Sequence, residues 1–277
     1  GRLATAVGAG AQANEYAATA IGGFSNATGI RSIAIGYGTQ ATAYDATAIG
    51  DRAEASEEWA TAIGSGARAT HLRSTALGSF ATAAGDGASA FGDGALANNI
   101  ASVALGSGSW ATAANSVAIG NGIVWNSNPW RDETVTFSEG IAIGNVSEVH
   151  GSRSIALGAG ATVGGWSMPE ADGLPGNIDD AVALGAGSRA DRNNTVSVGR
   201  AGAERQITNV AAGTQATDAV NLAQLDAASR YLQATGSADS DAGAYAEGDN
   251  ALAAGEASAA IGTGTVALGA GAGSYAK

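Results

Sequence analysis

The sequence contains no cysteine, one methionine, three prolines and a single lysine, and its apolar runs are at most five residues long. Without cysteine there are no disulfides, no thiol nucleophiles and no cysteine-based zinc sites. A phosphate-binding loop is excluded because the lysine is Lys277, at the end of the chain. The apolar runs are far below the roughly 20 residues that a transmembrane helix needs. We therefore expect this segment to make no membrane contact.

Positive charge is also scarce, since 13 Lys and Arg face 25 Asp and Glu and give a net charge of −12. Nucleic acids and anionic membranes are recognised by concentrated basic surfaces, so neither is an expected partner. No basic, apolar leader begins at Gly1, and we expect the chain to be a segment of a longer protein.

Small residues dominate instead: 67 Ala and 43 Gly make up 110 of the 277 positions. Alanine accounts for more than half of the 45% hydrophobic content, which leaves too little apolar bulk for an ordinary thick core. Such a composition fits either disorder or a regular small-residue repeat. The arrangement of the small residues decides between the two.

A five-residue block such as ATAIG, SIAIG or SVALG recurs with a strict period of fourteen residues. The glycines that close the first nine blocks are Gly8, Gly22, Gly36, Gly50, Gly64, Gly78, Gly92, Gly106 and Gly120. An alanine stands two residues before each of them, and eight of the nine are followed by another alanine five residues later. This regularity predicts a repeat fold and excludes disorder.

Fourteen residues with alternating side chains suit two short strands and two turns, which is one coil of a β-solenoid. Within a block, the large residue before the glycine and the residue two positions earlier share one face, and the alanine between them lies on the opposite face. The glycine is expected at the bend, where a positive φ is accessible at low cost.

The alanine columns form a surface without side chains longer than a methyl group. We predict that this surface packs against copies of itself in a closed symmetric oligomer. The alternative is that the alanines line the inside of a narrow solenoid.

Two insertions interrupt the period, near 121–138 and 162–179, within a predicted roll that spans residues 1–202. They hold all three prolines and three of the five tryptophans. Exposed aromatic residues beside arginine often dominate binding energy, so the insertions provide the candidate partner contacts. These are Trp125, Trp130, Arg131 and Trp166. The alternative is that the tryptophans fold back onto the roll or clamp a neighbouring chain.

After the roll, the pattern predicts a neck at 203–217, a short coiled-coil helix at 218–233 and the start of a second roll at 234–277. Thr217 or Asp218 is the expected helix cap. The expected contacts between chains in the neck and coiled coil are Val220, Leu222, Leu225 and Leu232. In the second roll, Gly248, Gly255, Gly262 and Gly269 recur every seven residues, half of the first period.

The blocks SVAIG and SIAIG, followed by RQITNVAAGTQATDAVNLAQL at 205–225, resemble the YadA-like head and neck of trimeric autotransporter adhesins of Gram-negative bacteria. The resemblance implies an all-β fold, a homotrimer of left-handed parallel β-rolls followed by a neck and a coiled-coil stalk. It also implies a cell-surface location, with an outer-membrane anchor elsewhere in the parent protein. The two insertions depart from the simple head repeat.

Chemistry-bearing motifs are scarce, and we expect no catalytic residue, no cofactor and no metal site. His71 and His150 both stand in expected turns and are interpreted as surface residues. The leading hypothesis is a non-enzymatic adhesin that attaches bacteria to a host cell-surface protein, an extracellular-matrix protein or other bacteria. The alternatives are an ice-binding solenoid, suggested by a column of Thr5, Thr19, Thr47, Thr61 and Thr75, and a purely structural solenoid. A solenoid enzyme would need clustered carboxylates and arginine, which the sequence does not show.

Overall fold

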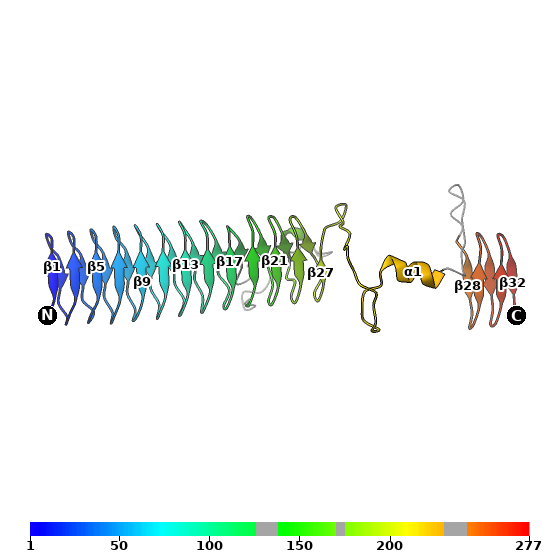
Figure 1. Ribbon diagram of the computed structural model, residues 1–277, viewed down its shortest axis with the longest axis horizontal. Coiled ribbons are helices and arrows are strands. Elements are labelled where there is room, and N and C mark those ends of the chain that lie inside the picture. Colours follow the sequence, from blue (N-terminus) through cyan, green and yellow to red (C-terminus); the bar gives the residue numbers. More distant parts are fainter. Residues whose placement is uncertain (126–137, 170–174, 230–242, 277) are drawn as a thin grey trace. The chain divides into compact units, whose positions relative to one another are not determined.

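The computed structural model describes residues 1–125, 138–169, 175–229 and 243–276. It divides into two compact units, Gly1–Arg205 and Gln206–Lys277, and each is considered by itself. The first is a regular stack of coils whose strands run side by side (Figure 1). The second holds a helix and a shorter stack.

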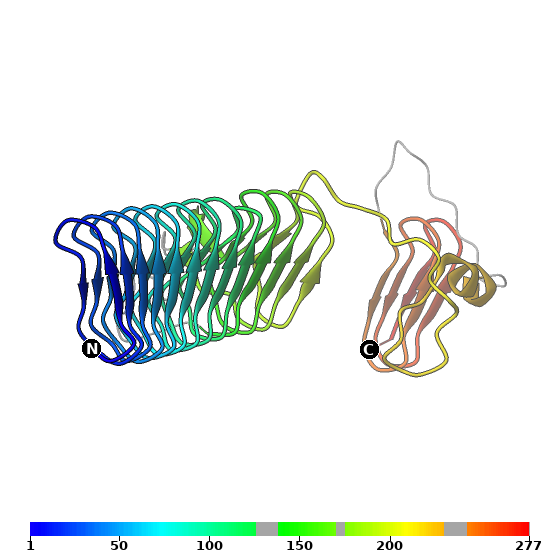
Figure 2. The same ribbon diagram turned by 60° about the vertical axis from the view of Figure 1, so that its left-hand side comes forward.

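Each coil of the first unit contributes one strand to each of two parallel sheets, except the last, which contributes to one sheet alone; the sheets therefore have 13 and 12 strands. The strands of the 13-stranded sheet are β1 (Thr5–Val7), β3 (Thr19–Ile21), β5 (Ile33–Ile35), β7 (Thr47–Ile49), β9 (Thr61–Ile63), β11 (Thr75–Leu77), β13 (Ser89–Phe91), β15 (Val103–Leu105), β17 (Val117–Ile119), β19 (Ile141–Ile143), β21 (Ile155–Leu157), β25 (Val182–Leu184) and β27 (Val196–Ser197). The strands of the 12-stranded sheet are β2 (Gln12–Ala13), β4 (Asn26–Ala27), β6 (Gln40–Ala41), β8 (Glu54–Ala55), β10 (Arg68–Ala69), β12 (Thr82–Ala83), β14 (Leu96–Ala97), β16 (Trp110–Ala111), β18 (Ile123–Val124), β20 (Glu148–Val149), β22 (Thr162–Val163) and β26 (Arg189–Ala190). Figure 2 shows the coils as flat loops stacked one behind the other.

Neighbouring coils pair with the register that the period predicts. Thr5 pairs with Thr19, fourteen residues later, and the same offset continues through the regular coils. Each insertion leaves this register intact: Val117 pairs with Ile141 and Ile155 with Val182 across the extra residues. The β-solenoid interpretation of the repeat is therefore confirmed.

The alanines of both sheets lie inside the roll. Ala62 of β9 and Ala69 of β10 are fully buried, as are most of their counterparts in the other coils. The prediction that the alanine surface packs against other copies of the chain is therefore wrong, and the alternative is correct. The reason is geometric: two alanine columns, one from each sheet, face each other, and methyl groups allow the two sheets of a narrow coil to approach closely.

Larger inward residues are compensated locally. Val124, Val149 and Val163 replace alanine inside the coils that carry the insertions. Gly140 lies against the first two, and a Cβ atom there would be 2.6 Å from Cγ1 of Val124. The absence of a side chain at Gly140 thus leaves room for the larger side chains of Val124 and Val149, and the packed volume of the interior stays similar.

The block positions require glycine because of their backbone conformation and the close approach of the next coil. Gly64 has a φ of +134°, and a Cβ atom on it would lie 2.3 Å from the carbonyl oxygen of Gly78 in the next coil. Gly94, two residues after the block glycine Gly92, differs from Gly64. Its φ is +62°, and a Cβ atom there would meet nothing within 4 Å. Coils therefore stack through backbone at the block glycine, as expected from its place in the repeat.

The first insertion begins later than the sequence suggests. Trp110 pairs with Ile123, thirteen residues on, because the turn at Asn121 is one residue shorter than in the other coils. The extra residues follow β18, and those from 126 to 137 lie outside the described part. The second insertion follows β22 and contains an antiparallel hairpin of β23 (Gly165–Pro169) and β24 (Pro175–Gly176).

The second unit contains helix α1 (Leu222–Ser229) and five short strands. Asn221 caps the helix, since its Oδ1 accepts a hydrogen bond from the Gln224 amide at 3.1 Å. The prediction of a cap at Thr217 or Asp218 is wrong, because the Asp218 carboxylate instead holds the backbone amides of Thr214 and Gln215. The strands are β28 (Tyr245–Glu247), β29 (Leu252–Ala254), β30 (Ala259–Ile261), β31 (Val266–Leu268) and β32 (Gly273–Tyr275). No helix of the described ranges is long and apolar enough to cross a bilayer.

Candidate functional site

The outward face of the 13-stranded sheet carries two columns of side chains. The residue at the start of each strand is Thr or Ser in six of the first seven coils and Val or Ile from Val103 onward. The second column is apolar throughout and is here called the apolar face. It consists of the large block residues, which are exposed or half-buried: Val7, Ile21, Ile35, Ile49, Ile63, Leu77, Phe91, Leu105, Ile119, Ile143, Leu157 and Leu184. Leu77 and Leu105 retain 44% and 47% of their accessible surface. Exposed apolar surfaces of this extent mark sites of association.

The outward face of the 12-stranded sheet, here called the polar face, has the opposite character. In its first coils it presents Gln12, Asn26, Gln40, Glu54, Arg68 and Thr82. Glu54 and Arg68 form an ion pair of 3.2 Å between neighbouring coils. The polar face is therefore well solvated, whereas the apolar face would be stabilised by burial against another protein surface.

An aromatic cluster marks the place where both insertions leave the polar face. The Trp125 ring stacks on His150 with ring centroids 5.7 Å apart, and Trp110 meets Trp125 edge-on at 6.4 Å. His150 Nε2 lies 3.1 Å from a carboxylate oxygen of Glu148. A Cβ atom on Gly165, where the hairpin begins, would lie 3.4 Å from the His150 ring. One histidine thus contacts the start of both insertions.

His150 is only 4% exposed, so its interpretation as a surface residue is wrong. The shortened turn at Asn121 pairs Trp110 with Ile123 and so places Trp125 two residues beyond that pair, in the same column as His150 of the next coil. The Trp125 ring stacks on the histidine as a result. His71, in contrast, is exposed as expected.

The candidate contact residues fall in different places. Trp125 is half-buried and packs against the alanine core, which agrees with the alternative that the tryptophans fold back onto the roll. Trp130 and Arg131 lie outside the described residues. Trp166 belongs to β23, and its backbone alone is described.

Sequence reasoning missed a second group of aromatic residues, at the turns of the earlier coils on the same edge as the insertions. The Arg31 guanidinium lies 4.8 Å from the centroid of Tyr44 and also pairs with Asp45. Tyr44 meets Trp59 edge-on at 6.0 Å, and Arg73 covers the Trp59 ring at 5.0 Å. A period of fourteen places these residues close together, so their columns could have been recognised in the sequence. Two cation–π contacts and the aromatic contact between them thus join four successive coils.

The predicted neck residues are exposed within one chain. Val220, Leu222 and Leu225 retain 68%, 71% and 58% of their accessible surface, and Leu232 lies outside the described residues. The Gln224 side chain closes the loop that runs from Gly213 to the helix. Its Oε1 accepts a hydrogen bond from the Gly213 amide at 2.8 Å, and its Nε2 donates one to the Gly213 carbonyl at 3.0 Å. The loop is therefore held by its own hydrogen bonds while its apolar side chains point to solvent.

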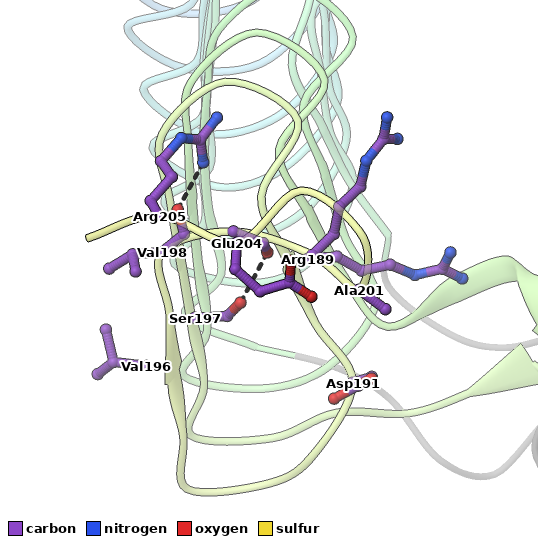
Figure 3. Close-up of a pocket in the computed structure, with 10 residues that line it drawn as sticks. Arg189, Asp191, Val196, Ser197, Val198, Ala201, Glu204 and Arg205 are labelled. Atoms are coloured by element: carbon purple, nitrogen blue, oxygen red, sulfur yellow. Dashed lines mark hydrogen bonds between the residues drawn. The ribbon is translucent and has the colours of Figure 1, made fainter. Parts of the chain in front are cut away.

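Arg205 closes the C-terminal end of the first roll. In earlier coils the block glycine packs against the next glycine's backbone, but at Gly185 the Arg205 guanidinium takes that place, 3.2 Å from where a Cβ atom on Gly185 would lie. Its nitrogens donate to the carbonyl oxygens of Val198 and Ala186, and the first of these bonds is drawn in Figure 3. Arg205 thus supplies hydrogen-bond donors to backbone carbonyl groups at the last turns of the roll.

Family models of known proteins match both the roll and the segment that follows it. The family model for the YadA head domain repeat matches residues 1–25, 27–53, 41–67, 55–81, 69–95, 97–122, 138–161, 179–200 and 246–272. The family model for the coiled stalk of trimeric autotransporter adhesin matches residues 206–248. No curated protein matches the chain.

Among solved structures, the chain is similar to the collagen-binding domain of the Yersinia adhesin YadA. The two sequences are 29% identical, and the match covers 83% of this chain and 99% of that chain with a TM-score of 0.43. Within the described ranges, no group of three or more His, Cys, Asp or Glu residues could hold a metal ion.

Proposed function

This chain belongs to the trimeric autotransporter adhesins with YadA head repeats, and from that premise we propose that it forms the adhesive head of a homotrimer. The head attaches a bacterium to host cells, to the extracellular matrix or to other bacteria. Its location is the cell surface, and the parent protein is anchored in the outer membrane. The attachment is non-enzymatic.

The apolar face is the observation that carries this proposal. Three copies that turn this face toward a shared axis bury the aliphatic columns against one another. The polar face and the turns then remain outside, available to a partner. The interior of a single roll consists mainly of alanine, so the shared apolar core supplies much of the burial that one chain lacks.

The neck completes the same assembly. Val220, Leu222, Leu225 and Leu232 are proposed to meet their counterparts around the axis and to lead into a coiled-coil stalk. Because the Gln224 side chain holds the loop from Gly213 to Gln224 within one chain, the backbone that carries Val220 and Leu222 has its shape before the three chains meet.

Specific contacts are assigned to the insertions. Trp130, Arg131 and Trp166 are the proposed partner contacts, and Trp125 holds the base of the first insertion against the roll. Adhesion then rests on many weak contacts, multiplied by the three copies of each insertion.

Two measurements test the proposal. Sedimentation velocity is expected to show a trimer, and a monomer at micromolar concentration would contradict it. Beads coated with the protein are expected to attach to cultured epithelial cells or to a matrix-coated surface. Replacement of residues 126–137 by a short glycine–serine linker is expected to reduce attachment while the trimer persists. Equal attachment by beads coated with an unrelated acidic protein would overturn the adhesin assignment.

A further inference from the structure

Three apolar side chains in successive coils interrupt the polar face, and we call them the strip: Leu96, Trp110 and Ile123. They are the outward residues of β14, β16 and β18, since the second residue of each of these strands is buried inside the roll. Leu96 pairs with Trp110 and Trp110 with Ile123, so the three form one column along the stack. Thr82 precedes this column and Glu148 follows it. The strip is therefore a short apolar column with a polar residue at each end.

The Trp110 ring is both accessible and held in place. It retains 40% of its accessible surface, and its ring meets Trp125 edge-on with centroids 6.4 Å apart. Trp125 in turn stacks on His150 and packs against the alanine core. The Trp110 ring therefore has little freedom to lose when a ligand covers it, which lowers the entropic cost of binding.

Hydrogen-bonding groups lie beside the apolar side chains of the strip. Asn98 stands two residues after Leu96, on the same side of the chain, and is exposed. Within the described residues, neither the Asn98 amide nor the indole N–H of Trp110 has a hydrogen-bond partner. The Glu148 carboxylate contacts His150 and keeps 29% of its accessible surface. A ligand on the strip can therefore both accept and donate hydrogen bonds at its margin.

The dimensions of the strip favour a sugar chain over a protein. A stable protein interface buries about 800 Å² on each partner, whereas the strip offers three apolar side chains among polar neighbours. Successive strip residues lie about 4.8 Å apart, which is similar to the length of one hexose unit in an extended β-linked chain. The C–H groups on the face of such a ring pack on aromatic and aliphatic side chains, while its hydroxyl groups bond to amides and carboxylates. A net charge of −12 repels an anionic glycan, so the matching ligand is neutral.

We propose that the strip binds an extended neutral glycan of β-linked hexose or N-acetylhexosamine units, laid along the stack with one sugar ring on Trp110. Leu96 and Ile123 contact the adjoining units, and Asn98 and Glu148 bond to their hydroxyl groups. That this glycan belongs to the surface to which the head attaches rests on the proposed function. The polar face lies outside in the proposed trimer, so three strips are accessible and together increase avidity.

The test uses the full chain with cellohexaose and chitohexaose, and calorimetry measures binding. Trp110→Ala is expected to weaken binding of the tighter ligand about tenfold, because the stacking surface is lost. Trp110→Phe keeps a ring and is expected to lose clearly less. The matched control is Trp59→Ala, since Trp59 is exposed to a similar extent, 44%, but lies at a turn of another coil. Its affinity is expected to stay within about twofold of the unmodified chain.

Two further measurements locate the site and define the charge of the ligand. Binding of a neutral ligand is expected to change little between low and high salt. Replacement of residues 126–137 by a short glycine–serine linker is expected to leave oligosaccharide binding unchanged, because no strip residue belongs to that segment. Should Trp110→Ala fail to fold, Leu96→Asn is the second variant. It gives the strip the residue type that Asn26 provides in β4 and is expected to weaken binding.

No binding of either oligosaccharide at millimolar concentration, or equal losses in Trp110→Ala and Trp59→Ala, would overturn the strip as a glycan site. Loss of binding in the linker variant would assign the glycan to the insertion instead. Tighter binding of a heparin hexasaccharide would refute a neutral ligand. Attachment of coated beads to cells is measured in parallel. Attachment without oligosaccharide binding refutes this inference alone and leaves a protein partner, whereas oligosaccharide binding without attachment to cells or matrix refutes the proposed function alone.

Discussion

The two sheets of the first roll share an interior and differ outside. Both are parallel, both stack with the same offset, and both present small residues inward. Outward, the 13-stranded sheet carries one unbroken column of large apolar residues beside a column of Thr, Ser, Val and Ile, whereas most of the 12-stranded sheet carries polar side chains. The inward alanines and the turn glycines thus suffice to form the coil. The outward positions do not determine the coil, so their residue types can differ. One face can serve self-association and the other can contact solvent or a partner.

The largest expected effect comes from a charge on the apolar face. Ile49→Asp places a carboxylate where three copies are proposed to meet, and an unpaired buried charge costs about 3 to 5 kcal/mol. We expect the trimer to dissociate in sedimentation velocity. Gln40→Asp puts the same charge on the polar face and is expected to leave the trimer intact. Dissociation by both variants, or by neither, would remove the difference between the faces.

A smaller effect is expected at the turns that join the sheets. Gly64→Ala forces a methyl group against the backbone of Gly78 at an unfavourable φ, and we expect a loss of about 3 kcal/mol or more in unfolding free energy. Gly94→Ala adds a methyl group in open space and is expected to cost roughly 1 kcal/mol. Chemical denaturation measures the unfolding free energy of each variant. Equal losses in the two variants would contradict backbone stacking at the block glycine.

Overpacking the shared interior is expected to affect both sheets alike. Ala62→Leu and Ala69→Leu add the same volume from opposite sides of one coil, and each is expected to cost about 1 to 3 kcal/mol. Thermal denaturation checks both variants. If one of them is tolerated, its alanine does not face the common core, and the shared interior is disproved for that sheet.

The smallest effect is expected from the ion pair of Arg153 and Asp180, which joins neighbouring turns at 2.7 Å. The hydrogen bonds from Arg153 lower the pKa of Asp180 below its ordinary value of 3.8. The pair therefore stabilises the fold above that value, and the contribution is lost as pH falls through the lowered pKa. Asp180→Asn is expected to flatten the acid limb of the melting-temperature profile slightly. An unchanged profile would show that the exposed pair contributes nothing measurable.

Much of the roll follows from the sequence alone. The fourteen-residue period predicts the coil, the register and the bend at each glycine, since Gly64 and its counterparts stand in fixed positions. The side on which alanine lies does not follow from the period, because a column of methyl groups suits a narrow interior and a close interface equally. Only the opposition of Ala62 and Ala69 across one coil shows that they form an interior.

The functional surfaces are less predictable for a related reason. One missing residue at the turn of Asn121 shifts the pairing and brings Trp125 onto His150, and no periodic pattern contains that shift. The C-terminal end of the first roll depends on how Arg205 folds back onto the turn at Gly185.

The constant register has a consequence for the history of such a chain. Loss or duplication of one fourteen-residue unit joins identical edges, so it preserves every column and changes the length by about 4.8 Å. Recombination between two repeats in the same register would produce such a step directly. The distance to which the head reaches can therefore vary among descendants in small uniform increments, without any need to invent a new fold or interface.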